Sequence, residues 1–490
     1  MAKENISLIL GLKVRYLRST SGLTLKQLSQ TSGISTAYLN EIEKGKKYPK
    51  MDKLYALAGA LGIPYDDLIS LKLNPELRAF EMVLNSPLLK KFPFHIFGMT
   101  SHDLIDLMAS HPKETGTLAS MLEELGRNYD MRVEHFYRTA LRSYQVLNQN
   151  YFPDLEKAGV TFRKSRGWDD QYCPTFSDLW KVLQEEYGVT AYEPRDNDKL
   201  TNFRSIYIPG VKGLFFHPDL TDREKAFLAG RELGCHYLGL KERSFSSPTL
   251  VEESFQEVFN NFQASYFSDA LLVPEKRIKA DLKALFKLPK WDEPTFLAML
   301  DTYHVTPEML FYRLSELIPH HFKTGRIHFL KLIRNADGRI RLEKRLNMSR
   351  VHVPNGLGLK EHFCRRWLSV GVLEESHLKE SDEPAIGLQR STFINGHSQF
   401  FCIAAGYPTT IKRDSYSSVT LGFQVNDDFK KTVKFGNDPV VPDRVLGQTC
   451  ERCPLSENEC SERIAPPSIY ENEQKAVRRR RELEEILQQV

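Results

Sequence analysis

Hydrophobic residues in the first 70 positions recur at helical spacing in three short runs. Leu25 and Leu28 lie three residues apart, and Leu39 and Ile42 repeat that interval. The segment 54–58 continues the same pattern with two leucines and two alanines. Side chains at i and i+3 share one face of a helix, so each run predicts a short helix with a buried stripe.

The residues between these runs predict where the helices begin and end. Thr24 and Ser35 immediately precede the first two runs and are suited to cap them. Gly33 supplies the left-handed conformation that a tight turn between two helices requires, and Gly45 ends the second helix. Pro64 opens a last short helix. Residues 1–72 are therefore predicted to form an all-α helix-turn-helix domain.

Beyond this domain the hydrophobic pattern changes three times. Residues 76–160 show helical periodicity interrupted by prolines, which predicts a helical spacer or dimerisation bundle. Residues 165–320 are mixed, with helices expected at 176–187, 221–240 and 252–269, and strands at 190–192, 203–208 and 214–216.

Residues 325–470 alternate in the manner of strands and predict a β-rich domain, for example at 326–330, 399–403 and 419–423. Residues 471–490 are predicted to form a short charged helix that includes Arg478–Arg481. Its simplest interpretation is a tail exposed to solvent. The fold class expected is a multidomain α+β protein.

Charge distinguishes the first domain from the rest. Residues 1–50 hold nine Lys or Arg and three acidic residues, a surplus of six, whereas the whole chain carries +4. Positive charge is thus concentrated where phosphate contacts are expected. On the second helix, polar residues remain on the outer face, which is the face a recognition helix turns to base edges. The residues expected to contact DNA are Lys26, Gln27, Ser35, Thr36, Tyr38, Asn40, Lys44, Lys46 and Lys47.

Residues 7–70 resemble the phage-repressor-like, xenobiotic-response-element type (XRE) of helix-turn-helix family. The family usually has Gln at the start of the first motif helix, where this chain has Leu25; neighbouring Lys26 and Gln27 could replace that contact. The resemblance implies binding to double-stranded operator DNA.

Composition is that of a soluble globular protein, with 41% hydrophobic and 27% charged residues. No apolar stretch approaches the 18 or more residues of a membrane span, and the N-terminus has no secretory signal pattern. Seven cysteines in 490 residues are too few for a disulfide scaffold. A reduced, cytoplasmic protein without membrane association is expected.

Residues 231–236 lie on a predicted helix and resemble the metal-binding helix of a zincin-like (ImmA/IrrE-like) domain. Active members use His-Glu-x-x-His, because two imidazoles at i and i+4 reach one zinc. The two ligand positions here hold Arg231 and Cys235, and the third falls at Asn261. Only the general base, Glu232, is retained. His236 is rotated by about 100° from Cys235 and cannot share its face. The domain is therefore predicted to be a pseudo-zincin rather than an enzyme, with Glu232 in an ordinary ion pair or hydrogen bond.

A cysteine cluster lies near the end of the chain. Cys450, Cys453 and Cys460 follow a C-x2-C-x6-C pattern, and a two-residue gap lets both thiolates face one metal. Cys364, in a Cys-x-x-Trp segment, is the best candidate for a fourth ligand. The region resembles the C-terminal domain of short-chain fatty-acyl-responsive regulators. We favour a [4Fe–4S] cluster, with zinc or unligated thiols as the alternatives.

Two functions from different classes follow. The first is a transcription regulator that binds a palindromic operator as a homodimer and senses a metabolite, such as a short-chain acyl-CoA, or a redox signal. The second is a metallopeptidase that cleaves a partner repressor, and the residues at the three ligand positions argue against it. A plain iron–sulfur redox protein would not explain the DNA-binding motif.

Overall fold

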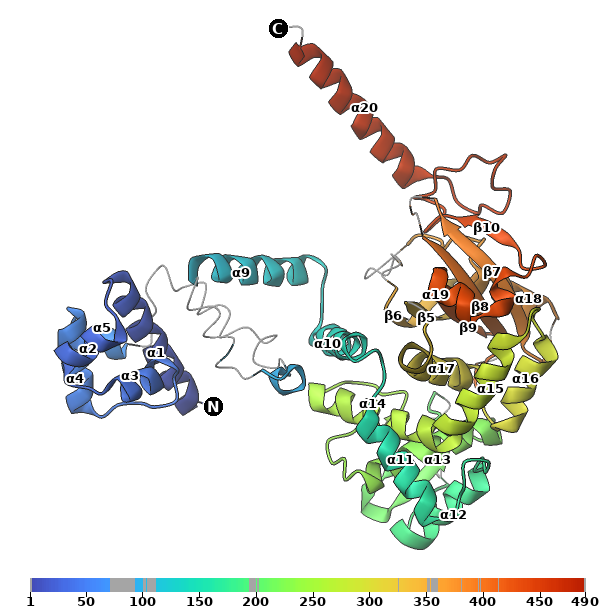
Figure 1. Ribbon diagram of the computed structural model, residues 1–490, viewed down its shortest axis with the longest axis horizontal. Coiled ribbons are helices and arrows are strands. Elements are labelled where there is room, and N and C mark those ends of the chain that lie inside the picture. The colour runs from blue at the N-terminus through green and yellow to red at the C-terminus, as the bar shows by residue number, and fades with distance from the viewer. Residues whose placement is uncertain are drawn as a thin grey trace. The chain divides into compact units, whose positions relative to one another are not determined.

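The computed structural model divides into two compact units, Met1–Ala140 and Leu141–Val490, and each is described by itself (Figure 1). It describes residues 2–70, 93–99, 103, 112–193, 200, 202–324, 326–349, 353, 360–379, 381–394, 396, 398–412 and 414–488. Residues 71–75, which the sequence pattern suggests as a linker, and most of the first half of the 76–160 spacer lie outside the described residues. The multidomain α+β class is confirmed.

Five helices make up the N-terminal domain, and their bounds are α1 Ala2–Thr20, α2 Leu25–Ser32, α3 Thr36–Glu43, α4 Met51–Leu61 and α5 Tyr65–Ile69. Their inner faces share one core, which contains Leu10, Val14, Leu28, Leu39, Ile42, Leu54, Leu57 and Leu68. Helix α1 packs against α3, α4 and α5, whereas α2 packs against α3 and α4.

Helix α1 approaches the end of α3 closely at Gly11. A Cβ built on Gly11 would lie 2.4 Å from the carbonyl oxygen of Ile42 and 2.9 Å from that of Glu43. Both are backbone atoms, so neither can rotate away. The close approach of α1 to α3 therefore requires glycine here.

We expect Gly11→Ala to destabilise the N-terminal domain by about 1–3 kcal/mol, because overpacking outweighs the gain in helix propensity. Gly59→Ala is the matched control. Gly59 also lies inside a helix, but no atom is within 4 Å of its Cβ position, so alanine should stabilise by about 0.5–1 kcal/mol. Hydrogen exchange of the α3 amides measures the change in stability of the domain in each variant. Equal protection in the two variants would show that α1 and α3 do not meet at this distance.

The described part of the spacer consists of the 3-10 helix η2 Phe94–Phe97 and the helices α9 Pro112–Asn128 and α10 Val133–Leu147. The next helix, α11 Pro153–Ser165, was predicted as part of the spacer. It packs instead on α14 within the second unit, where Phe152 and Leu155 join Phe262 and Tyr266 in one cluster.

The first half of the second unit is mainly helical with a small sheet. Its helices are α11, α12 Phe176–Tyr187, α13 Asp222–Tyr237, α14 Phe255–Leu272, α15 Glu275–Lys287, α16 Glu293–Thr302 and α17 Pro307–His321. The sheet has the order β1-β3-β2-β4, with strands β1 Thr190–Ala191, β2 Ser205–Ile208, β3 Gly213–Phe216 and β4 Ser246–Ser247. The predicted strands at 203–208 and 214–216 are present as antiparallel β2 and β3, which the 3-10 helix η4 Pro209–Val211 joins into a hairpin. Lys212 has the left-handed conformation at this turn.

The second half is built on a six-stranded sheet with the order β10-β7-β8-β9-β5-β6. Its strands are β5 Ile327–Arg334, β6 Ile340–Asn347, β7 Ala385–Phe393, β8 Gln399–Pro408, β9 Tyr416–Gln424 and β10 Asp443–Leu446. The remaining elements are α18 Leu368–Lys379, α19 Asp427–Thr432, η5 Lys434–Asn437 and α20 Ser468–Gln488.

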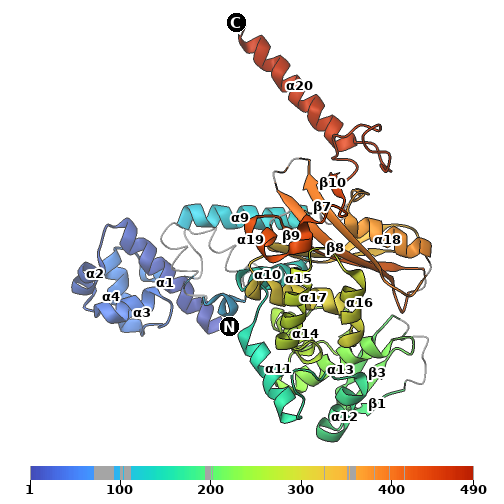
Figure 2. The ribbon, with the colours of Figure 1, turned by 45° about the vertical axis from the view of Figure 1, so that its right-hand side comes forward.

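Both faces of this sheet are covered. Helix α18 packs on one face, where Trp367, Val370 and Leu373 meet Leu330 and Leu332 (Figure 2). Helices α15 and α17 share the main core with side chains of the other face, which include Phe329, Phe401, Ile403, Leu421 and Phe423. The helical half and the β half of this unit are therefore joined by one hydrophobic core.

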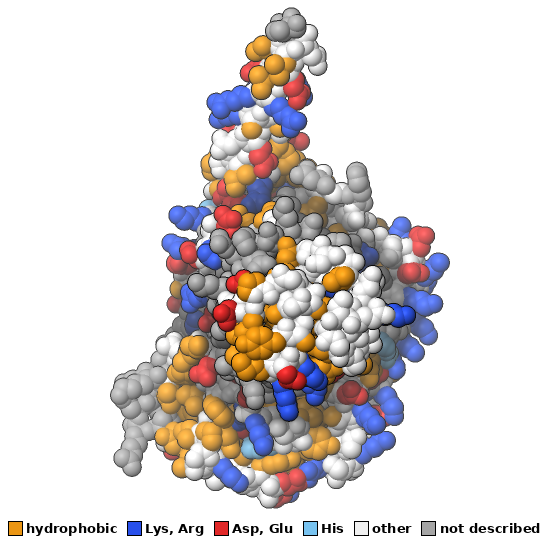
Figure 3. Space-filling view, turned by 90° about the vertical axis from the view of Figure 1, so that its left-hand side faces the viewer, with side chains coloured by type: hydrophobic (Ala, Val, Ile, Leu, Met, Phe, Trp, Pro, Cys, Tyr) orange, Lys and Arg blue, Asp and Glu red, His pale blue; other side chains and the backbone are white. Residues whose placement is uncertain are grey.

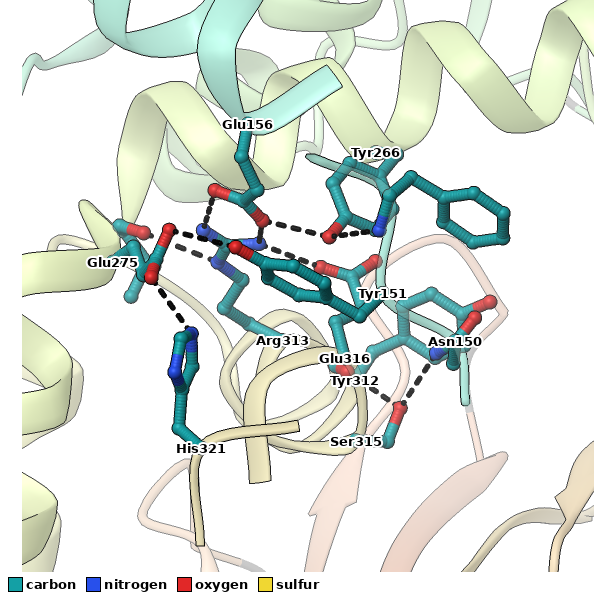
Figure 4. A network of polar contacts seen from close by, with 12 residues as sticks. Asn150, Tyr151, Glu156, Tyr266, Glu275, Tyr312, Arg313, Ser315, Glu316 and His321 are labelled. Carbon is teal, nitrogen blue, oxygen red and sulfur yellow. Dashed lines mark hydrogen bonds and ion pairs between the residues drawn. The ribbon is translucent and has the colours of Figure 1, made fainter. Parts of the chain in front are cut away.

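A buried polar network ties three helices together at Arg313, whose side chain is fully buried (Figure 4). Its guanidinium donates to the two carboxylate oxygens of Glu156 at 2.6 and 2.9 Å and to Glu316 at 3.0 Å. Tyr266 donates its hydroxyl to Glu156 at 2.7 Å. Burial alone would raise the pKa of Glu156, but the charge and hydrogen bonds of Arg313 hold it below its ordinary value. An ion pair thus joins helices α11 and α17, and the Tyr266 hydrogen bond joins α14 to them.

None of the described helices is both long enough and apolar enough to cross a bilayer.

Candidate nucleic-acid interface and cysteine cluster

The capping residues predicted for the helix-turn-helix pair are confirmed. The Thr24 hydroxyl accepts from the Gln27 amide at 3.2 Å, and the Gln27 side-chain oxygen accepts from the Thr24 amide at 2.8 Å. Gly33 has φ of +67°, and Ser35 accepts from the Tyr38 amide at 3.3 Å. These local hydrogen bonds fix the angle at which α3 leaves the turn.

Helix α3 divides cleanly into a buried and an outer side. Leu39 and Ile42 have no solvent exposure, as predicted for the inner stripe. Thr36 is exposed, while Tyr38 and Asn40 are half-buried with one side toward solvent. The N-terminal half of α3 therefore presents a small polar surface next to its buried stripe.

The remaining predicted DNA contacts lie around this surface with different roles. Lys26, Lys46 and Lys47 are exposed, and Lys44 is half-buried at the C-cap of α3. Gln27 and Ser35 are also exposed, but their oxygens already accept hydrogen bonds in the two caps. For these two residues the structure shows a capping role.

Sequence reasoning missed a cation beside the recognition helix. Lys53, in the first turn of α4, places its ammonium 4.2 Å from the centre of the Tyr38 ring. Lys50 precedes it and is exposed. The signal was the short Lys-rich loop before α4, but only the packing of α4 brings Lys53 to α3.

Two of the nine basic residues counted in 1–50 make hydrogen bonds within the domain and are not part of its positive surface. Lys13 is 3% exposed and donates to the carbonyl oxygens of Asp67, at 2.9 Å, and Ser70. Arg18 donates to both carboxylate oxygens of Glu43, at 2.6 and 2.9 Å, and these bonds raise the pKa of Arg18. The surplus of charge toward DNA therefore rests on the remaining Lys and Arg.

The four cysteines predicted to act together, Cys364, Cys450, Cys453 and Cys460, are all buried and free of disulfides. Two segments far apart in sequence bring them near one another. The Cys364 amide donates to the Gln448 carbonyl at 3.2 Å, and the Cys450 amide donates to the His362 carbonyl at 2.9 Å. The Trp367 indole donates to the Gly447 carbonyl at 2.9 Å, which closes this junction.

The thiols also act on one another electrostatically. Burial raises the pKa of Cys364 to about 11, and the neighbouring Cys453 and Cys450 add to the rise, while the backbone amides of Arg366 and Gly447 oppose it. Burial also raises the pKa of Cys460, with a contribution from Cys453. In the part of the chain that the structure describes, no three His, Cys, Asp or Glu side chains are arranged to hold a single metal ion.

The helix that resembles a peptidase helix is α13, and its retained carboxylate is already paired. Glu232 accepts two hydrogen bonds from Arg243, at 2.7 and 2.9 Å, so the expected ion pair is present. Arg231 has a buried Nε without a hydrogen-bond partner. The Asn261 side-chain oxygen accepts from the Ser244 amide at 3.1 Å. Burial raises the pKa of Cys235, which keeps this thiol protonated.

Comparison with known proteins identifies the class of the N-terminal domain. Residues 14–68 match the helix-turn-helix family model HTH_3. An uncharacterized HTH-type transcriptional regulator, y4dJ of Sinorhizobium fredii, is 36% identical over 62 residues, which are 13% of this chain and 80% of that protein. The HTH-type transcriptional repressor RghR of Bacillus subtilis is 43% identical over 60 residues, 12% of this chain and 44% of that protein.

The transcriptional regulator ClgR of Mycobacterium tuberculosis is 38% identical over 56 residues, 11% of this chain and 50% of that protein. The chain thus spans about half the length or less of RghR and ClgR. A solved structure titled as a Mycobacterium tuberculosis transcriptional regulator covers 66% of this chain and 93% of its own, with 16% identity and a TM-score of 0.45.

The fold and the caps define a helix-turn-helix DNA-binding protein. The chain belongs to the HTH-type transcriptional regulators.

Proposed function

We propose that the chain binds a palindromic operator as a homodimer, with α3 in the major groove. The observations that carry this are the exposed Thr36 and half-buried Tyr38 and Asn40 on α3, together with the exposed Lys26, Lys46 and Lys47 of the same domain. Asparagine pairs with adenine through two hydrogen bonds in the major groove, and lysines contact phosphates. Lys53 joins this surface as a further phosphate contact.

Two substitutions test the assignment on an operator selected from random-sequence DNA. Asn40→Ala should cost about 1–3 kcal/mol of operator binding and relax base preference at one position of each half-site. Lys46→Ala should weaken binding to every sequence and lower the salt slope by roughly one. Titrations at several salt concentrations separate the two effects. Unchanged operator preference in Asn40→Ala would remove this residue from base recognition.

The C-terminal half is proposed to sense a metabolite, such as a short-chain acyl-CoA, or a redox signal. Support comes from the four buried cysteines, since thiolates packed together need protons or a cation to offset their charge. Four cysteines are a donor set that would suit a [4Fe–4S] cluster, which we favour; zinc is the alternative. When bound, the cluster would supply a redox-sensitive charge. The cysteines and the backbone amides at Arg366 and Gly447 would hold it.

Cys364→Ser tests this site in the full chain. We expect loss of bound metal from anaerobically purified protein, together with loss of visible absorption if the metal is an iron–sulfur cluster. Cys402→Ser is the matched control, because Cys402 is equally buried but lies in β8 beside Ser391. That variant should retain the metal. Full occupancy in Cys364→Ser would show that the fourth ligand is another residue, and stoichiometric zinc without colour would remove the redox role.

The zincin-like half is proposed to be a non-catalytic scaffold in a cytoplasmic regulator. The metallopeptidase alternative needs a metal dication beside Arg231, whose fixed positive charge repels it. It also needs Glu232 as a free base, whereas Arg243 binds both oxygens of that carboxylate. Of the three ligand positions only Cys235 offers a strong zinc ligand, since Arg231 and Asn261 supply neither an imidazole, a thiolate nor a carboxylate.

A further inference from the structure

A cavity lies between helix α18 and the six-stranded sheet, on the face of the sheet that α18 covers. Its empty volume is about 380 Å³. Polar and apolar side chains both line it, among them His328, Trp367, Phe393, Phe400, Cys402 and Thr420. A second cavity, of about 270 Å³ between helices α15, α16 and α17 and the other face of the sheet, is lined by apolar residues alone. The polar groups therefore distinguish the first cavity from a packing void.

Two of these polar side chains reach the same side of the cavity because a neighbouring position has no side chain. His328 of β5 pairs in register with Gly422 of β9. A Cβ built on Gly422 would lie 2.2 Å from the Cε1 atom of His328, so glycine is required for the imidazole to lie across this strand. Thr420 is two residues from Gly422 on β9, and alternate residues of a strand share one face. The imidazole and the Thr420 hydroxyl therefore line the cavity together.

The hydroxyl of Thr420 is a buried polar group without a partner. Thr420 is 3% exposed, and its oxygen makes no hydrogen bond to any described residue. Two other polar side chains of the wall are paired. The Nδ1 atom of His328 lies 3.1 Å from the Ser349 hydroxyl oxygen, and the Ser391 hydroxyl accepts from the Gln389 amide at 2.9 Å. A buried hydroxyl without a partner costs free energy, and a hydrogen bond to a ligand removes that cost.

The wall of the cavity carries no charge. Its titratable side chains are His328 and Cys402. Burial lowers the pKa of His328 to about 4 and raises the pKa of Cys402 to about 12, so both groups are neutral near pH 7. The surface of α20, by contrast, mixes charged with hydrophobic side chains (Figure 3). An ion inside the cavity would have no counter-charge, so the wall selects an uncharged ligand.

Four rings follow one another around the cavity. The ring centres of Trp367 and Phe393 are 6.3 Å apart, as are those of Phe393 and Phe400, and the rings of Phe400 and His328 are 5.4 Å apart. Aromatic side chains of this kind pack well against a further ring. Most of the empty volume lies within contact distance of the wall, so the cavity admits a molecule of roughly six or seven non-hydrogen atoms, about the size of benzene.

We propose that this cavity binds a small uncharged ring compound with one hydroxyl group, of the phenol class, whose oxygen forms a hydrogen bond with Thr420. Trp367, Phe393 and Phe400 hold the ring. The inference rests on the sensing role proposed for the C-terminal half and gives that role a ligand site separate from the cysteines.

The wall of the cavity continues into the segment that positions the cysteines. Trp367 and Leu446 both line the cavity. The Trp367 indole donates to the Gly447 carbonyl, and a Cβ built on Gly447 would lie 3.0 Å from the sulfur of Cys453. A ligand that fixes Trp367 therefore stabilises this segment. Bound phenol should raise the hydrogen-exchange protection of the Cys364 amide, which donates across the same junction.

The first test is calorimetric titration of the full chain with phenol, benzene and benzoate. Phenol differs from benzene by one oxygen, and benzoate adds a charge that should prevent binding. Thr420→Val keeps the shape of the side chain and removes the hydroxyl, so the ratio of phenol affinity to benzene affinity should fall at least about fivefold. Thr392→Val is the matched control, because Thr392 lies in β7 of the same sheet but outside the cavity wall. The ratio should not change in that variant.

The second test locates the site with Cys402→Leu. The larger apolar side chain occupies the cavity, so the affinities for phenol and for benzene should both fall at least about tenfold. Circular dichroism checks that this variant folds, and the milder Thr420→Val decides the question if it does not. Undiminished binding in a folded Cys402→Leu variant would place the ligands elsewhere and overturn the proposal. An unchanged phenol-to-benzene ratio in Thr420→Val would overturn it as well.

The outcomes separate this cavity from the proposed function. A chain that holds its metal but binds no phenol would overturn the cavity site and leave the sensing role to the cysteines. Phenol binding that Thr420→Val weakens, in a chain without metal, would support the cavity and remove the redox part of the proposed function. Operator binding by α3 is measured independently, through Asn40→Ala and Lys46→Ala.

Discussion

Replacing Arg313 by methionine is expected to destabilise the unit Leu141–Val490 by about 3–5 kcal/mol. The side chain has no solvent exposure and binds Glu156 through two hydrogen bonds. Methionine fills a similar volume but leaves the Glu156 carboxylate buried without its counter-ion. All four tryptophans of the chain lie in this unit, so fluorescence during urea unfolding reports on it alone.

Arg223→Met is the matched control for this change. Arg223 also pairs with a carboxylate in the same unit, that of Asp301 at 2.5 Å, but the two side chains are 38% and 79% exposed. Exposed pairs contribute roughly 0–1 kcal/mol, so the control should differ little from wild type. A double variant, Arg313→Met with Glu156→Gln, should recover part of the loss because the stranded charge is removed. Equal losses in the two single variants would mean that Glu156 is not buried as a charged group.

The helix-turn-helix domain could be predicted from sequence because its signals are local. Thr24, Gly33 and Ser35 each act within three residues of their own position, and the structure confirms all three. The inner stripe of Leu39 and Ile42 follows from helical geometry alone. Short-range hydrogen bonds and the helical spacing of apolar residues thus determine most of the N-terminal fold.

What the sequence did not reveal depends on contacts between distant residues. Arg313 and Glu156 are 157 residues apart, and nothing in either segment marks them as partners. Lys13 and Arg18 entered the positive surplus of residues 1–50, because a charge count cannot distinguish an exposed basic residue from one that binds the carbonyls of α5 or pairs with Glu43. The position of Cys364 beside Cys450 required the pairing of two segments, which only the resemblance of this region to a known domain suggested.

A further buried carboxyl group, that of Asp269, lies close enough to Arg313 to interact with it and imposes a pH dependence. Asp269 is 3% exposed on α14. Burial raises its pKa to about 7, although Arg313 and Lys344 oppose the rise. Burial and the charge of Asp269 also raise the pKa of Glu316. The two carboxyl groups therefore favour the protonated form inside the fold.

The direction of the stability change with pH follows from the pKa of Asp269 in the folded chain and its pKa in the unfolded chain. Below pH of about 4 the group is protonated in both the folded and the unfolded chain, so it contributes no pH dependence. Between about 4 and 7 the unfolded chain releases the proton first, so stability falls as pH rises. Above about 7 the folded chain is also ionised and the penalty is constant.

Asp269→Asn should remove this penalty, because the amide has the same shape and no proton to lose. We expect the variant to be more stable than wild type at pH 8, by up to about 4 kcal/mol for a shift of about three pKa units, and to differ little at pH 4. Urea unfolding followed by tryptophan fluorescence across this pH range measures the difference. Asp301→Asn, at a carboxylate that is 79% exposed, is the control and should show no such trend. If Asp269→Asn were instead less stable than wild type at pH 8, Asp269 would be ionised in the fold and paired with Lys344 or Arg313.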